Sequence, residues 1–160
     1  MKLNRVALGL ASVLAAGGCS EAWSHSFVRT DPPAAVDGVS VALVSRQCDR
    51  QVDPNWQTYA DVLGLDVDMR VTNAAGSSVT FDPAKVRLLA DGLARAPHRS
   101  DSMETIPAGG SKTFTVHFLE HDDNLACNVP MTLAIAGAAE IGSMSVPLAP
   151  LNFLASRTDI

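Results

Sequence analysis

The chain lacks the features that most directly identify an enzyme or a nucleic-acid-binding protein. It has no Gly-x-Ser-x-Gly nucleophile motif, and Gly109-Gly110 is not part of a complete phosphate-binding loop. Its 12 Lys and Arg residues are outnumbered by 17 Asp and Glu residues and form no basic stripe, so phosphate backbones would be repelled. We therefore expect no enzymatic activity, no cofactor and no nucleic-acid partner.

Long apolar runs are also missing. After residue 18, no segment approaches the roughly eighteen consecutive apolar residues of a membrane-spanning helix. The first eighteen residues instead have the order of a secretory signal, in which Lys2 and Arg5 precede an uncharged apolar run over residues 6–16 and then small residues. We predict a signal peptide over residues 1–18. An ordinary cleaved signal with an incidental cysteine and a short retained anchor are the alternatives.

The end of this signal carries a recognisable motif. Ala16-Gly17-Gly18-Cys19 resembles a bacterial lipobox, with alanine where leucine is more usual three positions before the cysteine. The resemblance implies that Cys19 is lipidated, becomes the first mature residue and attaches the protein to a membrane through its acyl chains. Ser20, in place of aspartate, is similar to the sorting pattern of outer-membrane lipoproteins. The expected localisation is therefore the outer membrane, on its periplasmic face or at the cell surface.

Cysteine is scarce, with only three residues in the chain. With Cys19 assigned to the lipid, Cys48 and Cys127 remain, and two cysteines in an exported chain indicate a disulfide. No Cys-x-x-Cys spacing favours a redox or metal pair. Closing a loop of about 80 residues would stabilise the fold by roughly 4–5 kcal/mol in the chain-entropy model. We predict a structural disulfide between Cys48 and Cys127.

The remaining chain divides by its polarity pattern. Residues 19–38 contain Asp31-Pro32-Pro33 and Asp37-Gly38 without sustained periodicity, which predicts a lipidated, extended tether. From Val39 onward, apolar and polar residues alternate, and we predict one β-sandwich domain over residues 39–155. A short C-terminal tail over residues 156–160 would follow it.

Apolar and polar side chains alternate with period two most clearly over residues 63–72. Turn residues recur at short intervals, and Asp91-Gly92 is the strongest local hairpin signal. Gly137, in an alanine-rich stretch, favours another hairpin. No amphipathic helical pattern competes. The sequence therefore predicts an all-β protein, an antiparallel sandwich of about seven to nine short strands.

Several of these segments resemble one known group of domains. They are Val71-Thr72-Asn73, Phe81-Asp82-Pro83, the stretch from Leu88 to Asp91-Gly92, Ile106-Pro107-Ala108-Gly109 and Phe114-Thr115-Val116-His117-Phe118. Together they are similar to the immunoglobulin-like, telokin-like domains of bacterial lipoproteins and exported proteins. The resemblance covers about residues 39–136 and departs at Leu93, near which these domains often have tyrosine. It implies an immunoglobulin-like fold in an exported protein, without a shared catalytic site.

Histidine spacing suggests a metal site only if the local structure is helical. His117 and His121 would share a face of a helix, but the surrounding residues alternate as in a strand. Four residues of strand would separate the two by roughly 13 Å, too far to share one ion. We expect no metal there, unless a turn beginning at Glu120 shortens the distance. His98 and Met103 are two further residues that a copper carrier could use.

Two acidic groups are weaker candidates. Asp122-Asp123-Asn124 with Glu120 could chelate calcium, but the segment lacks the glycine and spaced carboxylates of a known calcium loop. Asp and Asn are also ordinary turn residues. Asp66 and Asp68 form a carboxylate pair on the predicted wet face of one strand, where solvation by itself accounts for them. We assign neither group a function.

Large aromatic residues are rare, at 5% of the chain, which draws attention to Trp56 and Tyr59. Both lie in a polar segment between two predicted strands. Such residues usually cap the edge of a core, but an exposed aromatic pair also suits contact with an envelope protein or a glycan. We predict that Trp56 and Tyr59 form a partner-contact site, with Trp56 at least one third exposed.

The sequence favours a non-catalytic envelope lipoprotein whose β-sandwich acts as a binding or accessory module. The alternative is a periplasmic ligand- or metal-carrier protein that uses surface His and Met residues. The two interpretations differ in whether His98, Met103, His117 and His121 converge in space.

Overall fold

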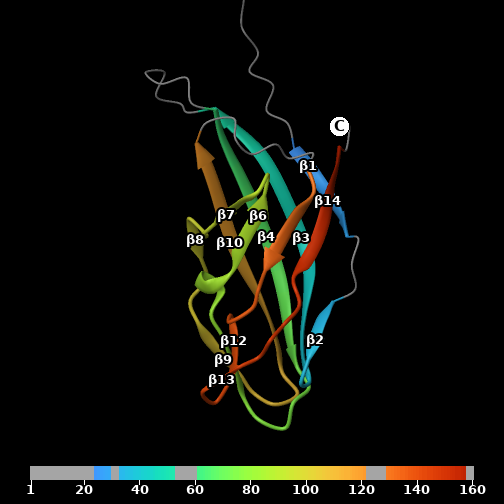
Figure 1. Ribbon diagram of the computed structural model, residues 1–160, viewed down its shortest axis with the longest axis vertical. Coiled ribbons are helices and arrows are strands. Elements are labelled where there is room, and N and C mark those ends of the chain that lie inside the picture. Colours follow the sequence, from blue (N-terminus) through green and yellow to red (C-terminus); the bar gives the residue numbers. More distant parts are fainter. Residues whose placement is uncertain (1–23, 30–32, 53–60, 122–128, 158–160) are drawn as a thin grey trace, which may run out of the picture.

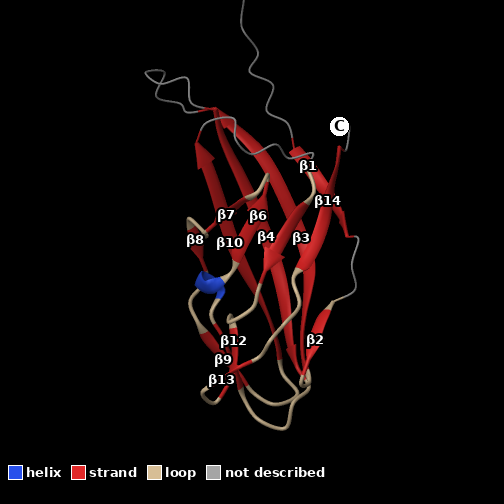
Figure 2. Ribbon diagram, viewed as in Figure 1, coloured by secondary structure: helices blue, strands red, loops and turns tan. Residues whose placement is uncertain are grey.

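The computed structural model describes residues 24–29, 33–52, 61–121 and 129–157. Figures 1 and 2 show an elongated molecule built almost wholly from antiparallel strands. The strands are β1 (Ser24–Arg29), β2 (Ala34–Val36), β3 (Val39–Val52), β4 (Asp61–Asn73), β5 (Val79–Phe81), β6 (Arg87–Ala90), β7 (Leu93–Arg95), β8 (Arg99–Ser100), β9 (Glu104–Ile106), β10 (Ser111–His121), β11 (Met131–Ala134), β12 (Ala139–Ile141), β13 (Met144–Ser145) and β14 (Leu151–Arg157), with one 3₁₀ turn, η1 (Pro83–Lys85). Within these ranges no helix is long and apolar enough to cross a bilayer.

The described strands form two hydrogen-bonded sheets. The larger has the order β7-β6-β11-β14-β1-β3-β4-β10-β8, with β2 also paired to β3, and the smaller has the order β13-β12-β5-β9. The predicted all-β antiparallel sandwich is confirmed. It contains more strands than expected, because seven of the described strands are only two or three residues long, and four of these form the smaller sheet.

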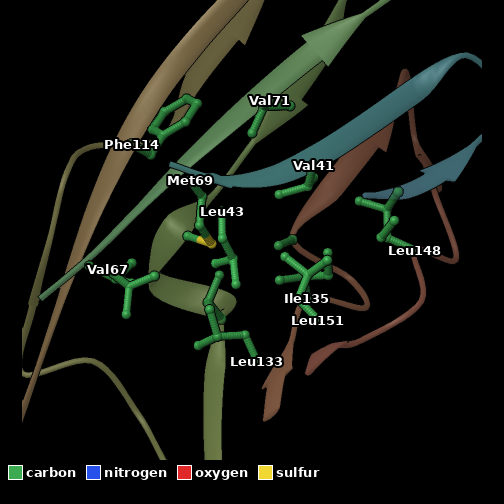
Figure 3. Close-up of a cluster of buried hydrophobic side chains, with 14 of the residues drawn as sticks. Val41, Leu43, Val67, Met69, Val71, Phe114, Leu133, Ile135, Leu148 and Leu151 are labelled. Atoms are coloured by element: carbon green, nitrogen blue, oxygen red, sulfur yellow. The ribbon is translucent and has the colours of Figure 1, made fainter. Parts of the chain in front are cut away.

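The buried apolar residues that the structure describes form one hydrophobic core, which joins the layers. Side chains from β3, β4 and β10 gather with side chains from β11, β14 and the adjoining segments (Figure 3): Val41, Leu43, Val67, Met69, Val71, Phe114, Leu133, Ile135, Leu148 and Leu151. The smaller sheet joins this core through Phe81, whose ring lies 4.9 Å from the ring of Phe114 between centroids. These residues are the apolar half of the period-two pattern, so the alternation correctly identified the core-facing positions.

The predicted tether over residues 19–38 is wrong in its extent. β1 pairs with both β14 and β3, and β2 pairs with β3, so sheet structure begins at Ser24 rather than at Val39. The pairing of β1 with β14 and β3 joins distant segments and leaves no local signal in the sequence. The β2–β3 pairing is local, and its signal was the Asp37-Gly38 turn, which the tether prediction treated as part of a linker. At the other end β14 runs to Arg157, two residues into the predicted tail.

Two short hairpins follow directly from turn chemistry. Asp91-Gly92 joins β6 to β7, as predicted, and Asp37-Gly38 joins β2 to β3 in the same way. In both turns the Asp has φ near +51° and the Gly φ near +78°, the left-handed pair that a two-residue hairpin needs. The predicted hairpin at Gly137 is wrong, because the chain there leaves the larger sheet after β11 and enters the smaller sheet at β12.

A β-bulge in β3 changes which residues face the core. The register with β4 shifts between Leu43 and Ser45, which leaves Val44 as the extra, unpaired residue with 47% of its surface exposed. Odd-numbered residues face the core before the bulge, and the parity reverses after it. Cys48 therefore lies opposite Leu65 with no exposed surface, instead of on the outer face.

Candidate functional site

The outer face of β4 and β10 carries a group of polar side chains that contact each other across the two strands. The inward residues of both strands are buried, whereas Asp66, Asp68, Thr115 and His117 lie on the opposite, outer face. The register places Asp66 opposite His117 and Asp68 opposite Thr115. Two cross-strand pairs therefore stand side by side on one surface.

The first pair is ionic when His117 is protonated. The Nδ1 atom of His117 is in close contact with Oδ1 of Asp66. The His117 side chain is only 19% exposed, whereas that of Asp66 is 54% exposed. Because Asp66 holds Nδ1, the imidazole has a fixed orientation and its Nε2 atom is the nitrogen left for another partner.

His98 joins this pair from the segment that leads into β8. Its ring lies 6.1 Å from the His117 ring between centroids, with 69° between the planes. Its backbone N–H also donates a 2.8 Å hydrogen bond to the His117 carbonyl oxygen. The rings meet edge to face, and because His98 is exposed the pair lies at the protein surface.

Thr115, from the second pair, joins β10 to β4 and also to the residue that follows β8. The Thr115 hydroxyl donates to Oδ1 of Asp68 at 2.7 Å. Thr115 also makes two hydrogen bonds with Asp101. The Thr115 N–H donates to Oδ2 of the Asp101 carboxylate at 2.8 Å, and the Thr115 carbonyl oxygen accepts from the Asp101 N–H at 3.0 Å. The Asp101 carboxylate thus substitutes for a backbone acceptor beside the short β8–β10 pairing.

The four predicted carrier residues converge only in part. His98 and His117 come together, whereas Met103 lies in the loop after β8 with 61% of its surface exposed. His121 ends β10, which stays in register with β4 up to that residue, so the turn at Glu120 does not form. Among the described residues, no group of three or more His, Cys, Asp or Glu side chains could hold a metal ion.

Several predicted positions lie outside the described residues. These are the signal with the lipidation site Cys19, the partner-contact residues Trp56 and Tyr59, the Asp122-Asp123-Asn124 segment, and Cys127. Cys48 is described and fully buried. The disulfide, the lipid and the aromatic contact therefore stay predictions.

Sequence reasoning did not identify the contact between Asp66 and His117. It placed both residues on the wet faces of their strands, which is correct, but it paired Asp66 with Asp68 along one strand. The signal that could have found it was the period-two pattern of both strands together, since two outward residues become neighbours once the strands pair. The register itself depends on residues far away in the chain.

Comparison with other proteins adds the fold relationship. No known family model matches the chain, and no curated protein does either. Among solved structures, the chain is similar to the crystal structure of a "putative lipoprotein (ycdA)" from Bacillus subtilis subsp. subtilis str. 168, with a TM-score of 0.58 and 14% identity. The likeness covers 77% of this chain and 38% of that one. At this identity it shows that the two proteins share a β-sandwich fold.

Proposed function

We propose that the protein is a lipid-anchored, non-catalytic component of the bacterial envelope whose β-sandwich serves as a binding or accessory module. The observation that carries the proposal is the short distance from the lipobox to the fold: only residues 20–23 separate Cys19 from the start of β1. The description of the similar Bacillus protein as a lipoprotein supports the same interpretation. The motif segments quoted above further support an immunoglobulin-like, telokin-like type of sandwich.

A lipid on Cys19 would determine which end of the domain faces the membrane. β1 runs antiparallel to β14, so the start of the domain lies beside its end, at the top of Figure 1. The fully extended link from Cys19 to Ser24 spans about 17 Å at most. A lipid on Cys19 would therefore hold this end close to the bilayer, and the β2–β3 hairpin at the opposite end would point away from it.

The proposed disulfide would stabilise the whole domain. Cys48 is fully buried in the half of β3 that pairs with β1, and its thiol is not free, which supports a bond to Cys127. An exported domain gains stability from such a bond because it restricts the unfolded chain.

Fractionation of cells tests the anchor. Cys19→Ser should release the protein from membranes or leave an unprocessed precursor, with loss of incorporated labelled palmitate. Ser20→Asp is the matched variant, because it keeps the acceptor cysteine and should alter only the choice of membrane. A Cys19→Ser protein as membrane-bound and as labelled as the wild type would overturn the lipoprotein proposal.

The binding role is tested separately at the aromatic pair. Trp56→Ala should weaken capture of an envelope partner or glycan while leaving the denaturation midpoint close to that of the wild type. If the substitution instead lowers the unfolding free energy by about 3–5 kcal/mol, Trp56 fills the core and is not a contact residue.

A further inference from the structure

We propose that His98 and His117, with Asp66 behind His117, form a surface site for one divalent first-row transition-metal ion, Cu²⁺ in preference to Zn²⁺. This site is distinct from the predicted His117–His121 combination and does not depend on the lipid anchor. It is formed by the pairing of β4, β10 and the segment before β8, which brings together residues 66, 98 and 117.

The ring positions suit a shared ion. Two imidazoles that each bind one ion through a nitrogen at about 2.0–2.1 Å have centroids about 5–6 Å apart. The observed separation of the His98 and His117 rings, 6.1 Å, is close to this range, and rotation of the exposed His98 side chain is the adjustment that ion binding would require. The backbone bond between the two residues keeps their main chains fixed while this happens.

Asp66 gives His117 the second contact that metal-binding histidines usually have. A histidine ligand normally donates its other N–H to a carboxylate, which fixes the tautomer and makes the ligating nitrogen more basic. The contact between Nδ1 of His117 and Oδ1 of Asp66 meets this requirement and leaves Nε2 for the ion. The partial burial of the His117 ring adds to its preorganisation.

The donor set selects the class of ion. Imidazole nitrogen suits Cu²⁺, Zn²⁺ and Ni²⁺, and the Irving–Williams order places Cu²⁺ first. Ca²⁺ and Mg²⁺ prefer shells of oxygen atoms, which two imidazoles do not supply. No third His, Cys, Asp or Glu completes the site within the described part of the chain. Water would fill the remaining positions, and such an open site suits reversible loading more than a structural role.

Titration of the full-length chain in detergent, purified without a histidine tag, tests the proposal. Calorimetry with CuSO₄ and then with ZnCl₂ should give one ion per chain, with tighter binding of Cu²⁺. His98→Gln and His117→Gln should each weaken Cu²⁺ binding by about tenfold or more, and Asp66→Asn should weaken it by about tenfold. His121→Gln is the matched control and should bind as the wild type does.

Nuclear magnetic resonance of the imidazole nitrogens provides a measurement that needs no variant. Zn²⁺ should shift the His117 Nε2 resonance and one His98 nitrogen together, and leave the His117 Nδ1 resonance in its protonated range. The proposal is overturned if the wild type binds Cu²⁺ no better than the double variant His98→Gln/His117→Gln. It is also overturned if His121→Gln loses as much affinity as His117→Gln, or if Zn²⁺ leaves both imidazoles unchanged.

Discussion

The side chain of Asn73 reaches from the end of β4 to Ile106 at the end of β9, where its Nδ2 atom donates a 3.0 Å hydrogen bond to the Ile106 carbonyl oxygen. The same amide donates to the Ser77 carbonyl at 2.9 Å, and its Oδ1 accepts from the Ala75 N–H at 3.0 Å. Asn73 has no exposed surface and is the only buried polar residue among those described. It therefore joins three segments at the end of the sandwich that carries the β2–β3 hairpin.

Asn73→Ala should lower the free energy of unfolding by roughly 2–4 kcal/mol, because it leaves two carbonyls and one N–H unpaired in a buried site. Asn73→Asp should also destabilise, since a carboxylate cannot donate either bond. Urea denaturation followed by circular dichroism measures both. The exposed Asn152 is the matched position, and Asn152→Ala should cost much less. Equal decreases in the free energy of unfolding for Asn73→Ala and Asn152→Ala would show that the buried amide contributes nothing special to stability.

Gly38 and Gly92 provide a matched comparison of backbone strain and crowding. Both occupy the second position of an Asp-Gly hairpin with φ near +78°. A Cβ on Gly38 would lie 2.8 Å from the Ala75 backbone nitrogen, whereas a Cβ on Gly92 meets nothing within 4 Å. Both alanine variants should lose about 1 kcal/mol or more from the left-handed conformation. Gly38→Ala should lose at least about 1 kcal/mol more because backbone must move. Thermal denaturation that ranks Gly92→Ala as the less stable variant would contradict this geometry.

The bulge at Val44 predicts that the fold tolerates deletion of this one residue. Removal of Val44 takes out the one residue of β3 that has no partner in β4, so Cys48 should stay opposite Leu65 and the proposed disulfide should still form. Deletion of Asp68 removes a paired residue and should disrupt the ladder. Alkylation under denaturing, non-reducing conditions followed by mass spectrometry should find Cys48 and Cys127 unmodified in the wild type and in the Val44 deletion. Free Cys48 in the Val44 deletion, with native-like circular dichroism, would show that the bulge has another role.

Lys85 should titrate abnormally. Its Nζ atom donates a 2.7 Å hydrogen bond to Oε1 of Glu140, and this bond is the main reason that the pKa of Lys85 is raised above 10.5. A raised folded-state pKa means that the pair's stabilising contribution is present below pH 10.5 and is lost as the pH rises through the folded-state value. Glu140→Gln should bring the pKa of Lys85 down toward 10.5, as measured by nuclear magnetic resonance titration. Asp82→Asn should lower it less, because Asp82 acts only through its charge. A larger effect of Asp82→Asn would reverse this ranking.

Local chemistry determined much of the fold. The alternation over residues 63–72 identified which side chains of β4 enter the core, and Asp91-Gly92 identified a hairpin with its left-handed turn. Both features depend on neighbours in the chain, since side-chain direction has a period of two and positive φ favours particular residue types. The N-terminal order of charge, apolar run and small residues is likewise a local pattern, and it provides the prediction of export.

Tertiary structure decided the features that depend on which strands meet. The sequence did not reveal that β1 joins β14, that Gly137 carries the chain between sheets, or that Asp66 and His98 both approach His117. The bulge at Val44, which turns Cys48 toward the core, is set by the register of β3 against β4. Pairing between segments distant in the chain depends on the edges, the volume and the hydrogen-bond partners that the rest of the fold leaves available. No single stretch of sequence contains that information. Local patterns therefore predicted the strands, whereas contacts in the folded sandwich determined which strands pair.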